Sequence, residues 1–205
     1  ANPFSAFKNF KAFPALLGFM FPFFLFLIAG HSVQSSWTFY TMYRFDWDEA
    51  MVGYSLALVG IVVAIVQGGL VKVVVRALGE QLTVIIGMAL WSLGLILFAS
   101  ANKEWMMFAY ILPYCLGGVA GPTMQGIMSN IVPENMQGQL QGILTSIMSL
   151  TSILGPPLMT YIFYLFSGDK AMFDFPGAPF ALGAVMMVAA LFMTVSPLKA
   201  ALKKT

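Results

Sequence analysis

Charged residues are scarce in this chain. Of its 205 residues only 9% are Asp, Glu, Lys or Arg, whereas 60% are hydrophobic and 15% are aromatic. A soluble domain cannot hide so much apolar surface from water, but a protein in a bilayer needs such a composition, and the mean hydropathy is +0.86. The net charge of +2 is too small to indicate nucleic-acid binding. The composition therefore predicts an integral membrane protein.

Cysteine is nearly absent too, since Cys115 stands alone in an apolar run. A single thiol excludes a disulfide within the chain and a cysteine-based metal cluster. The first residues, ANPFSAFKNFK, are polar and basic, and they lack both the short apolar core of a signal peptide and an initiator Met. We therefore expect no signal peptide, and a chain that is either processed or a piece of a longer one.

Catalytic arrangements are missing as well. The chain has one histidine, His31, with no triad-like setting of Ser, Cys or carboxylate around it. The sequence GGVAG lies inside an apolar stretch and lacks the Lys-Ser/Thr that follows a phosphate-binding loop. No His, Cys, Asp or Glu spacing is typical of a metal site. We therefore expect no enzyme, no cofactor and no metal.

Long apolar stretches are what the sequence has instead. About 20 apolar residues in a helix cross the roughly 30 Å of hydrocarbon in a bilayer. Connections as short as GE and NK require neighbouring helices to pack antiparallel. The sequence thus predicts an all-α bundle over residues 13–197, followed by a tail at 198–205. Its six membrane helices are expected at about 13–43, 49–78, 81–101, 104–132, 134–166 and 178–196.

The distribution of basic residues predicts the orientation. Six crossings place both ends of the chain on the same side of the membrane. Seven of the ten Lys and Arg residues lie on that side: Lys8, Lys11, Lys72, Arg76, Lys199, Lys203 and Lys204. The other side has Arg44, Lys103 and Lys170. Because basic loops stay in the cytoplasm, we expect both termini to be cytoplasmic.

The first helix carries a polar patch in the sequence GHSVQSSW. His31, Gln34 and Ser35 share one helical face, and Trp37 follows close by. A titratable group inside a membrane segment is by default a candidate for function. One interpretation is a hydrogen-bonding wall for a substrate. The other is a neutral histidine bonded to a neighbouring helix or to interfacial water, and the sequence leaves both open.

The fourth helix contains prolines and glycines in LPYCLGGVAGPTMQG. Pro113 and Pro122 each remove a backbone donor and can bend the helix. The glycines allow another backbone to approach closely, and Gln125 adds one amide to their face. A bent helix of this kind suits a cavity wall. It suits a tightly packed helix pair at least as well.

The fifth helix has its small and polar residues on one stripe. At about 100° per residue the stripe is formed by Gly138, Gln141, Gly142, Thr145, Ser149 and Ser152. Thr151 and Gly155 are exceptions on the otherwise apolar side. Such a stripe is typical of helix packing in membranes. A water-filled path would need a similar one, so packing is favoured but not the only interpretation.

The turn between the second and third helices, in GGLVKVVVRALGEQ, carries charge. Lys72 and Arg76 share a face and precede a tight turn at Gly79 and Glu80. These cations either anchor the helix at the lipid headgroups or form ion pairs with a neighbouring domain as part of a gate.

Several of these motifs, in this order and spacing, resemble a known family. They are RFDWDEAMVGYSLA, ALGEQ, PTMQGIMS, QGQLQG and ILGPP. The chain resembles the C-terminal six-helix half of the major facilitator superfamily, and most closely its tetracycline/proton antiporter group of multidrug exporters. Residues 1–12, with NPFSAF, resemble the end of the cytoplasmic loop that joins the two halves of such proteins.

The resemblance implies two six-helix domains that rock about a central site. His31, Gln34, Trp37 and Gln125 would line the substrate cavity. The stripe from Gly138 to Ser152 would face the N-terminal six-helix half, whether that half belongs to the same polypeptide or to a separate chain. Residues Lys72, Arg76, Gly79 and Glu80 would form a cytoplasmic gating loop.

The chain departs from the tetracycline group at two positions. Val63 and Trp91 stand where the group has a histidine and an aspartate. We therefore expect a proton-coupled exporter of another hydrophobic or amphipathic small molecule, in the inner membrane of a bacterium, whose coupling carboxylate lies in the other half. The alternative is a membrane scaffold or assembly subunit that reuses the fold without transport.

Overall fold

The computed structural model describes residues 13–168, 171 and 173–202. Within these ranges the chain forms helices and connecting loops, with no strand. The expected linker at 1–12, Lys170, and residues 203–205 of the expected tail lie outside the described residues.

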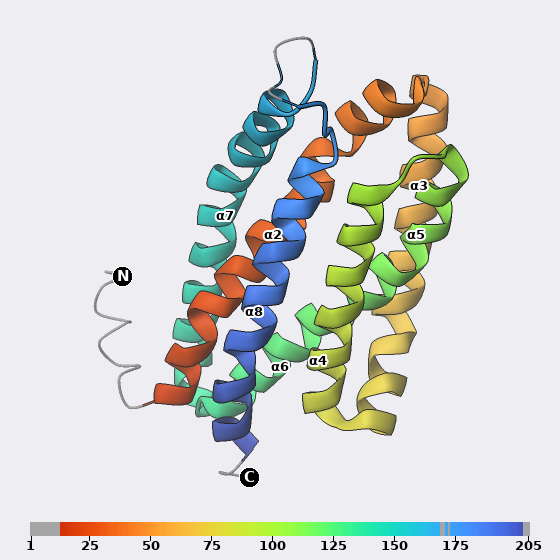
Figure 1. Ribbon diagram of the computed structural model, residues 1–205. Helices are drawn as coiled ribbons and strands as arrows, with labels where there is room; N and C mark the ends of the chain where they lie inside the picture. The colour runs from red at the N-terminus through yellow and green to blue at the C-terminus, as the bar shows by residue number, and fades with distance from the viewer. Residues whose placement is uncertain (1–12, 169–170, 172, 203–205) are drawn as a thin grey trace.

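Helix α2 (Pro14–Phe45) runs the length of the bundle between α7 (Gln137–Leu165) and α8 (Ala178–Leu202) (Figure 1). It begins with a proline, whose missing N–H is not needed in a first turn. It ends at Asp46, which adopts the left-handed conformation with φ 54° and donates its N–H to the carbonyl of Met42. Large apolar side chains of α2, among them Phe19 and Phe23, are fully buried.

The next helical run descends and returns along the other side of the bundle (Figure 1). It comprises α3 (Glu49–Ile65), a π-helical turn (Val66–Leu70) and α4 (Val71–Ser100). The Asp48 carboxylate starts α3 by accepting the N–H of Met51 at 2.8 Å. The run reverses at Gly79, where φ is 77° and ψ is 163°, a conformation that a side chain disfavours. The reversal falls in the expected turn at Gly79 and Glu80.

The single helix expected over 104–132 is two helices in the structure. They are α5 (Glu104–Gly117) and α6 (Ala120–Ile131). Pro122 has no N–H to offer the carbonyl of Gly118, and the N–H of Gly118 bonds to Cys115 over a tighter turn, at 2.9 Å. The α-helical hydrogen bonding is therefore interrupted, and α6 crosses one end of the bundle towards α7 (Figure 1).

A short 3-10 turn, Glu134–Met136, joins α6 to α7. The first residue of α7, Gln137, ties the two helices together. Its amide donates to the carbonyls of Ser129 at 2.8 Å and Val132 at 2.9 Å, and it accepts the Ser129 hydroxyl at 2.8 Å. This glutamine thus caps the carbonyl end of α6, a role that its place in QGQLQG did not indicate.

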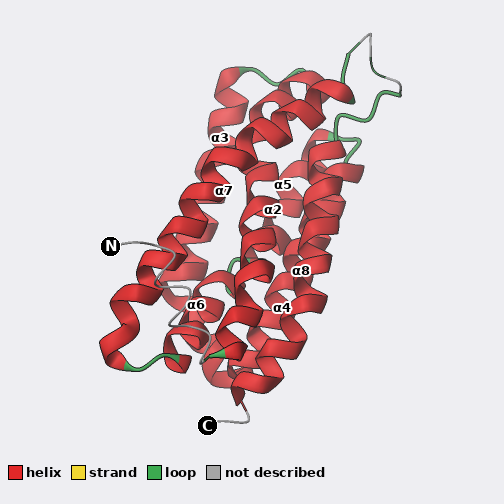
Figure 2. Cartoon of the chain, turned by 90° about the vertical axis from the view of Figure 1, so that its left-hand side faces the viewer, coloured by secondary structure: helices red, strands yellow, loops and turns green. Residues whose placement is uncertain are grey.

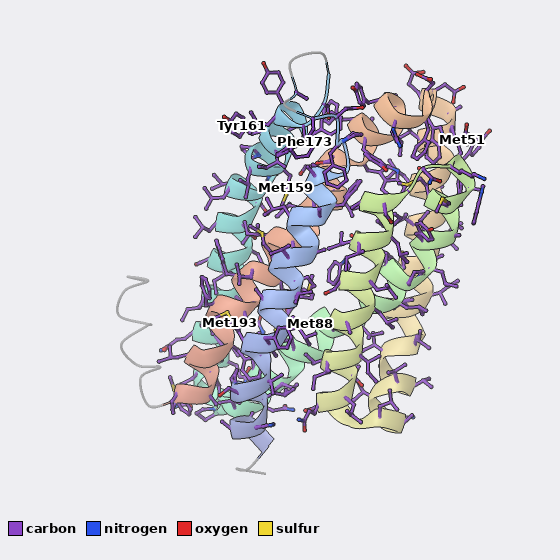
Figure 3. The ribbon with its side chains drawn as sticks, viewed as in Figure 1. Met51, Met88, Met159, Tyr161, Phe173 and Met193 are labelled. Atoms are coloured by element: carbon purple, nitrogen blue, oxygen red, sulfur yellow. The ribbon has the colours of Figure 1, made fainter. Side chains whose placement is uncertain are left out.

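Aromatic and methionine side chains fill the interior. Met88 and Met159 are fully buried between helices, whereas Tyr161 lies on the outward side of α7 with 59% of its surface exposed (Figure 3). Helix α3 is much less covered: only Val52 and Ser55 are buried in it. A long apolar helix with so little cover must face lipid or another protein domain.

The two ends of the bundle differ in charge. The start of α2, the turn at Gly79 within α4, and the end of α8 lie at one end (Figures 1 and 2). Described basic residues at this end are Lys72, Arg76 and Lys199. The loops at the opposite end are mainly acidic, with Asp46, Asp48, Glu49, Glu104 and Asp174. Among the described helices, the stretches long and apolar enough to cross a membrane are Pro14–Phe45, Glu49–Ser100, Glu134–Leu165 and Ala178–Ala201.

Candidate functional site

A cavity of about 510 Å³ opens between α2, α3, α4, α5 and α7. Its wall is mostly apolar with several polar groups, which is the usual composition of a small-molecule site. None of its described lining residues is Asp, Glu, Lys or Arg. The polar lining residues are His31, Gln34, Thr38, Thr151 and Ser152, and the amphipathic rings of Trp37, Trp91 and Tyr114 also line the cavity.

One face of α2 supplies the largest part of this wall. His31, Gln34 and Thr38 recur at helical spacing and all line the cavity. Gln34 and Thr38 are exposed, and His31 is half-buried. The Nδ1 atom of His31 is buried and has no hydrogen-bond partner among the described residues. The helix therefore presents the exposed side chains of Gln34 and Thr38 to the cavity, with the half-buried imidazole of His31 beside them.

Trp37 also lines the cavity, but its polar atom is already engaged. Only 2% of its surface is exposed, and its indole N–H donates to the Ser55 hydroxyl at 2.9 Å. Ser55 in turn donates to the carbonyl of Val52 at 2.7 Å. Trp37 therefore fastens α2 to α3, and only its ring is available to a ligand.

Helix α7 approaches this wall at Gly155. A Cβ atom at this position would lie 2.5 Å from the Cγ and Cδ2 atoms of His31. The nearby Thr151 is buried and lines the cavity, with its hydroxyl donating to the carbonyl of Met148 at 2.9 Å. Of the two exceptions on the apolar side of α7, Gly155 thus contacts α2, and Thr151 is buried at the cavity wall.

Three aromatic rings form another corner of the cavity, here called the aromatic corner: Phe26, Trp91 and Tyr114. The ring centroids of Phe26 and Trp91 are 4.7 Å apart at 84°, and those of Trp91 and Tyr114 are 5.6 Å apart at 78°. All three line the cavity. They come from α2, α4 and α5, so no local sequence pattern joins them.

Gln125 does not line this cavity, in contrast to the expectation for the fourth helix. The interruption between α5 and α6 separates it from the wall residues of α2. Gly121 of α6 lies next to a wall residue instead. An added Cβ at Gly121 would lie 3.3 Å from the Phe26 ring. The proline-glycine segment therefore packs against the wall, and the side-chain amide of Gln125 is not part of the wall.

The stripe of α7 faces outward. Each of its members, Gly138, Gln141, Gly142, Thr145, Ser149 and Ser152, is exposed. An added Cβ at Gly138 or Gly142 would meet nothing within 4 Å. The buried side of α7 consists of Leu140, Ile143, Leu144, Thr151, Gly155 and Met159. No described residue therefore packs against these two glycines.

The expected gating loop borders a second, smaller cavity of about 310 Å³ at the basic end of the bundle. Lys72, Arg76 and Glu80 line it, opposite Pro122 and Thr123 of α6. Lys72 and Arg76 are exposed. The turn is held by the Thr83 hydroxyl, which donates to the carbonyl of Gly79 at 2.7 Å. Two exposed cations thus lie beside a turn that the Thr83 hydroxyl holds.

Known proteins share sequence similarity with most of this chain. The family model described as Major Facilitator Superfamily matches residues 15–205. The chain is 39% identical to "Tetracycline resistance protein, class G" from Vibrio anguillarum over 74% of this chain and 39% of that protein. It is 35% identical to "Tetracycline resistance protein, class C" from Escherichia coli over 79% of this chain and 41% of that protein.

A human relative matches at a lower level. "Hippocampus abundant transcript-like protein 1" from Homo sapiens is 26% identical over 92% of this chain and 40% of that protein. The chain thus spans about two fifths of the length of each of these relatives.

Proposed function

The chain belongs to the major facilitator superfamily, and on that premise we propose that it is the C-terminal six-helix half of a secondary active transporter. It is a multi-pass membrane protein with long apolar helices. Membership in a family of transporters agrees with the expectation that it is not an enzyme. The proposed partner is an N-terminal six-helix half, which would complete the protein to roughly the length of its relatives.

The proposed six crossings follow from the path of the chain. The run Glu49–Ser100 has 52 residues and turns back at Gly79, so it would cross twice. Helices α5 and α6 together would make one further crossing despite their interruption. The start of α2 and the end of α8 lie at the basic end of the bundle, so the orientation proposed from the positive-inside rule has both termini in the cytoplasm. The proposed location is the bacterial inner membrane, as for a bacterial transporter of this kind.

The cavity is the observation that carries the proposal. It combines a volume suited to a drug-sized molecule, about 510 Å³, with a wall that contains the exposed amide of Gln34 and the half-buried imidazole of His31. Its rim includes Ser152, which is also a member of the exposed stripe of α7. A second six-helix half packed on that stripe would close the cavity into a central site, as alternating access requires.

The proposed substrate is a hydrophobic or amphipathic small molecule, and the proposed direction is export coupled to protons. Support comes from the relatives named for tetracycline resistance and from the mostly apolar wall. The described cavity has no carboxylate, and a proton-coupled cycle needs a group that exchanges a proton. His31 is a titratable group in this wall, and the proposed coupling carboxylate lies in the N-terminal half.

A transport assay on the full-length protein tests this function. The purified protein is reconstituted into liposomes, a pH gradient is imposed, and movement of tetracycline and of the neutral dye phenylnaphthylamine is followed. Transport that needs both protein and gradient is expected for at least one of them, and His31→Ala should weaken it. Gradient-dependent transport of neither compound would favour the scaffold alternative and contradict the proposal.

A further inference from the structure

A further cavity, of about 640 Å³, opens at the acidic end of the bundle, outside the candidate substrate site, and is here called the charged cavity. The segment where α2 ends and the segment that joins α4 to α5 form it together, and both lie at the upper end in Figure 1. The first segment contributes Arg44 and Asp46, and the second contributes Lys103 and Glu104. Each segment thus supplies one cation and one anion to the same cavity.

The four charged side chains do not neutralise one another by direct contact. All four are exposed, and no ion pair joins them to each other or to another residue that the structure describes. The charged cavity therefore offers two positive and two negative groups with no net charge. A ligand with a single charge would meet a like charge as well as a partner, whereas a ligand that carries both signs can pair with both.

Buried contacts hold the two segments at a fixed separation. The Tyr40 hydroxyl of α2 donates to the carbonyl of Ala101, directly after α4, at 3.3 Å. Trp47 is only 6% exposed, and its ring centroid lies 6.1 Å from that of Phe45 and 5.3 Å from that of Phe108 on α5. The backbones that carry the charges are thus positioned by packing that needs no ligand, which lowers the cost of ordering them on binding.

The charged cavity lies where membrane-spanning stretches end. The stretch Pro14–Phe45 ends beside Arg44, and the stretch Glu49–Ser100 ends shortly before Lys103. Trp105 also lines the cavity and is 62% exposed, and tryptophan is enriched where lipid headgroups meet hydrocarbon. These positions put the cavity at the level of the headgroups in the leaflet at the acidic end.

From these observations we propose that the charged cavity binds the headgroup of a zwitterionic aminophospholipid, phosphatidylethanolamine, from the leaflet at the acidic end. Arg44 and Lys103 bind its phosphate, and Asp46 and Glu104 accept hydrogen bonds from its ammonium group. An ammonium with three N–H donors can form such charge-assisted hydrogen bonds, whereas the trimethylated nitrogen of phosphatidylcholine has no N–H to donate. The site lies outside the substrate cavity, and its occupation does not require transport.

Lipids that share their acyl chains and differ in the headgroup test this specificity. The full-length protein is delipidated in detergent, and phosphatidylethanolamine, phosphatidylcholine and phosphatidylglycerol are titrated one at a time. The dissociation constant of the first bound lipid is measured by native mass spectrometry. Since an exposed ion pair changes affinity by up to about fivefold, we expect phosphatidylethanolamine to bind at least about threefold more tightly than either other lipid.

A double variant tests the residues without changing the net charge. Lys103→Gln combined with Glu104→Gln removes one cation and one anion from the charged cavity and should abolish the preference for phosphatidylethanolamine. Glu49→Gln combined with Lys199→Gln is the matched control. It makes the same two changes at exposed positions that do not line the cavity, and it should keep the preference.

Arg44→Gln combined with Asp46→Asn repeats the test on the other segment with the same expected loss, and it replaces the first double variant if that one fails to fold. Equal affinity of the wild type for the three lipids would overturn the inference, as would an unchanged preference in the double variants. Displacement of the bound lipid by an equimolar amount of soluble phosphoethanolamine would assign the site to a free small molecule and overturn it too. None of these outcomes involves transport, so such a failure leaves the proposed function untouched.

Discussion

The ring of His31 on α2 lies directly against the backbone of Gly155 on α7, since a Cβ there would come within 2.5 Å of the imidazole. This contact joins the polar wall of the cavity to the helix that carries the exposed stripe. Motion of α7 relative to α2 would therefore change the packing around the histidine. The candidate site and the helix of the proposed domain interface thus share a direct contact.

Gly155→Ala should destabilise the protein through this contact. The added methyl group overlaps the imidazole and forces one of the two helices to shift, at a cost of about 1–3 kcal/mol. A fall in the thermal unfolding midpoint in detergent is the expected result. Gly142→Ala on the same helix is the control, because nothing lies within 4 Å of its added Cβ; equal effects of the two variants would contradict the contact.

Ser55→Ala should weaken the contact between α3 and α2. The substitution leaves the buried indole N–H of Trp37 without its acceptor, which costs about 1–3 kcal/mol. The unfolding midpoint should fall, and Ser55→Thr should recover part of the loss. Ser149→Ala, at an exposed position of α7, should leave the midpoint unchanged. A similar fall in that control would contradict the role of the Ser55 hydroxyl.

Gly79→Ala should strain the turn at the basic end of the bundle. At φ 77° and ψ 163° a residue with a side chain costs about 1–3 kcal/mol more than glycine. We expect a lower unfolding midpoint and slower transport by the full-length protein. Gly69→Ala provides the comparison, since this glycine lies in a helical turn with open space around it. Unchanged stability of the Gly79 variant would show that the turn is conformationally free.

Tyr43→Phe should loosen the connection between α7 and α8. The Tyr43 hydroxyl accepts the N–H of Gly168 at 2.8 Å and donates to the Asp174 carboxylate at 3.2 Å. Without these bonds the amide of Gly168 should exchange its hydrogen faster. Tyr54→Phe, at a tyrosine that is 71% exposed, should not alter that exchange. Protection of Gly168 in the Tyr43 variant equal to that in the wild type would contradict this role.

Periodicity made part of the site predictable from the sequence. The spacing of His31 and Gln34 placed them on one face of α2, and both line the cavity. The wheel of α7 likewise separated a polar side from an apolar side, and the polar side is exposed. Both features repeat along a single helix, so the pattern is visible in a local stretch of sequence.

Contacts between distant segments were not predictable in this way. Trp91 and Tyr114 come together only because α4 and α5 pack closely at Gly117. Gln125 was assigned to the wall by the resemblance and by its place on the glycine face of one bent helix over 104–132. The combination of Gly118 and Pro122 was the available signal for the interruption. It was read as a bend, and it is the point at which α6 leaves the direction of α5.

The central claim is that the cavity is a substrate site opened and closed by two rocking halves, and accessibility of Gln34 tests it most directly. Gln34→Cys is introduced into the full-length protein freed of other reactive cysteines, and labelling by a membrane-impermeant maleimide is measured from each side of oriented vesicles. The account predicts labelling that a transported compound slows and that shifts between sides when the pH gradient is reversed. A cysteine that reacts equally under all conditions, or from neither side, would contradict it.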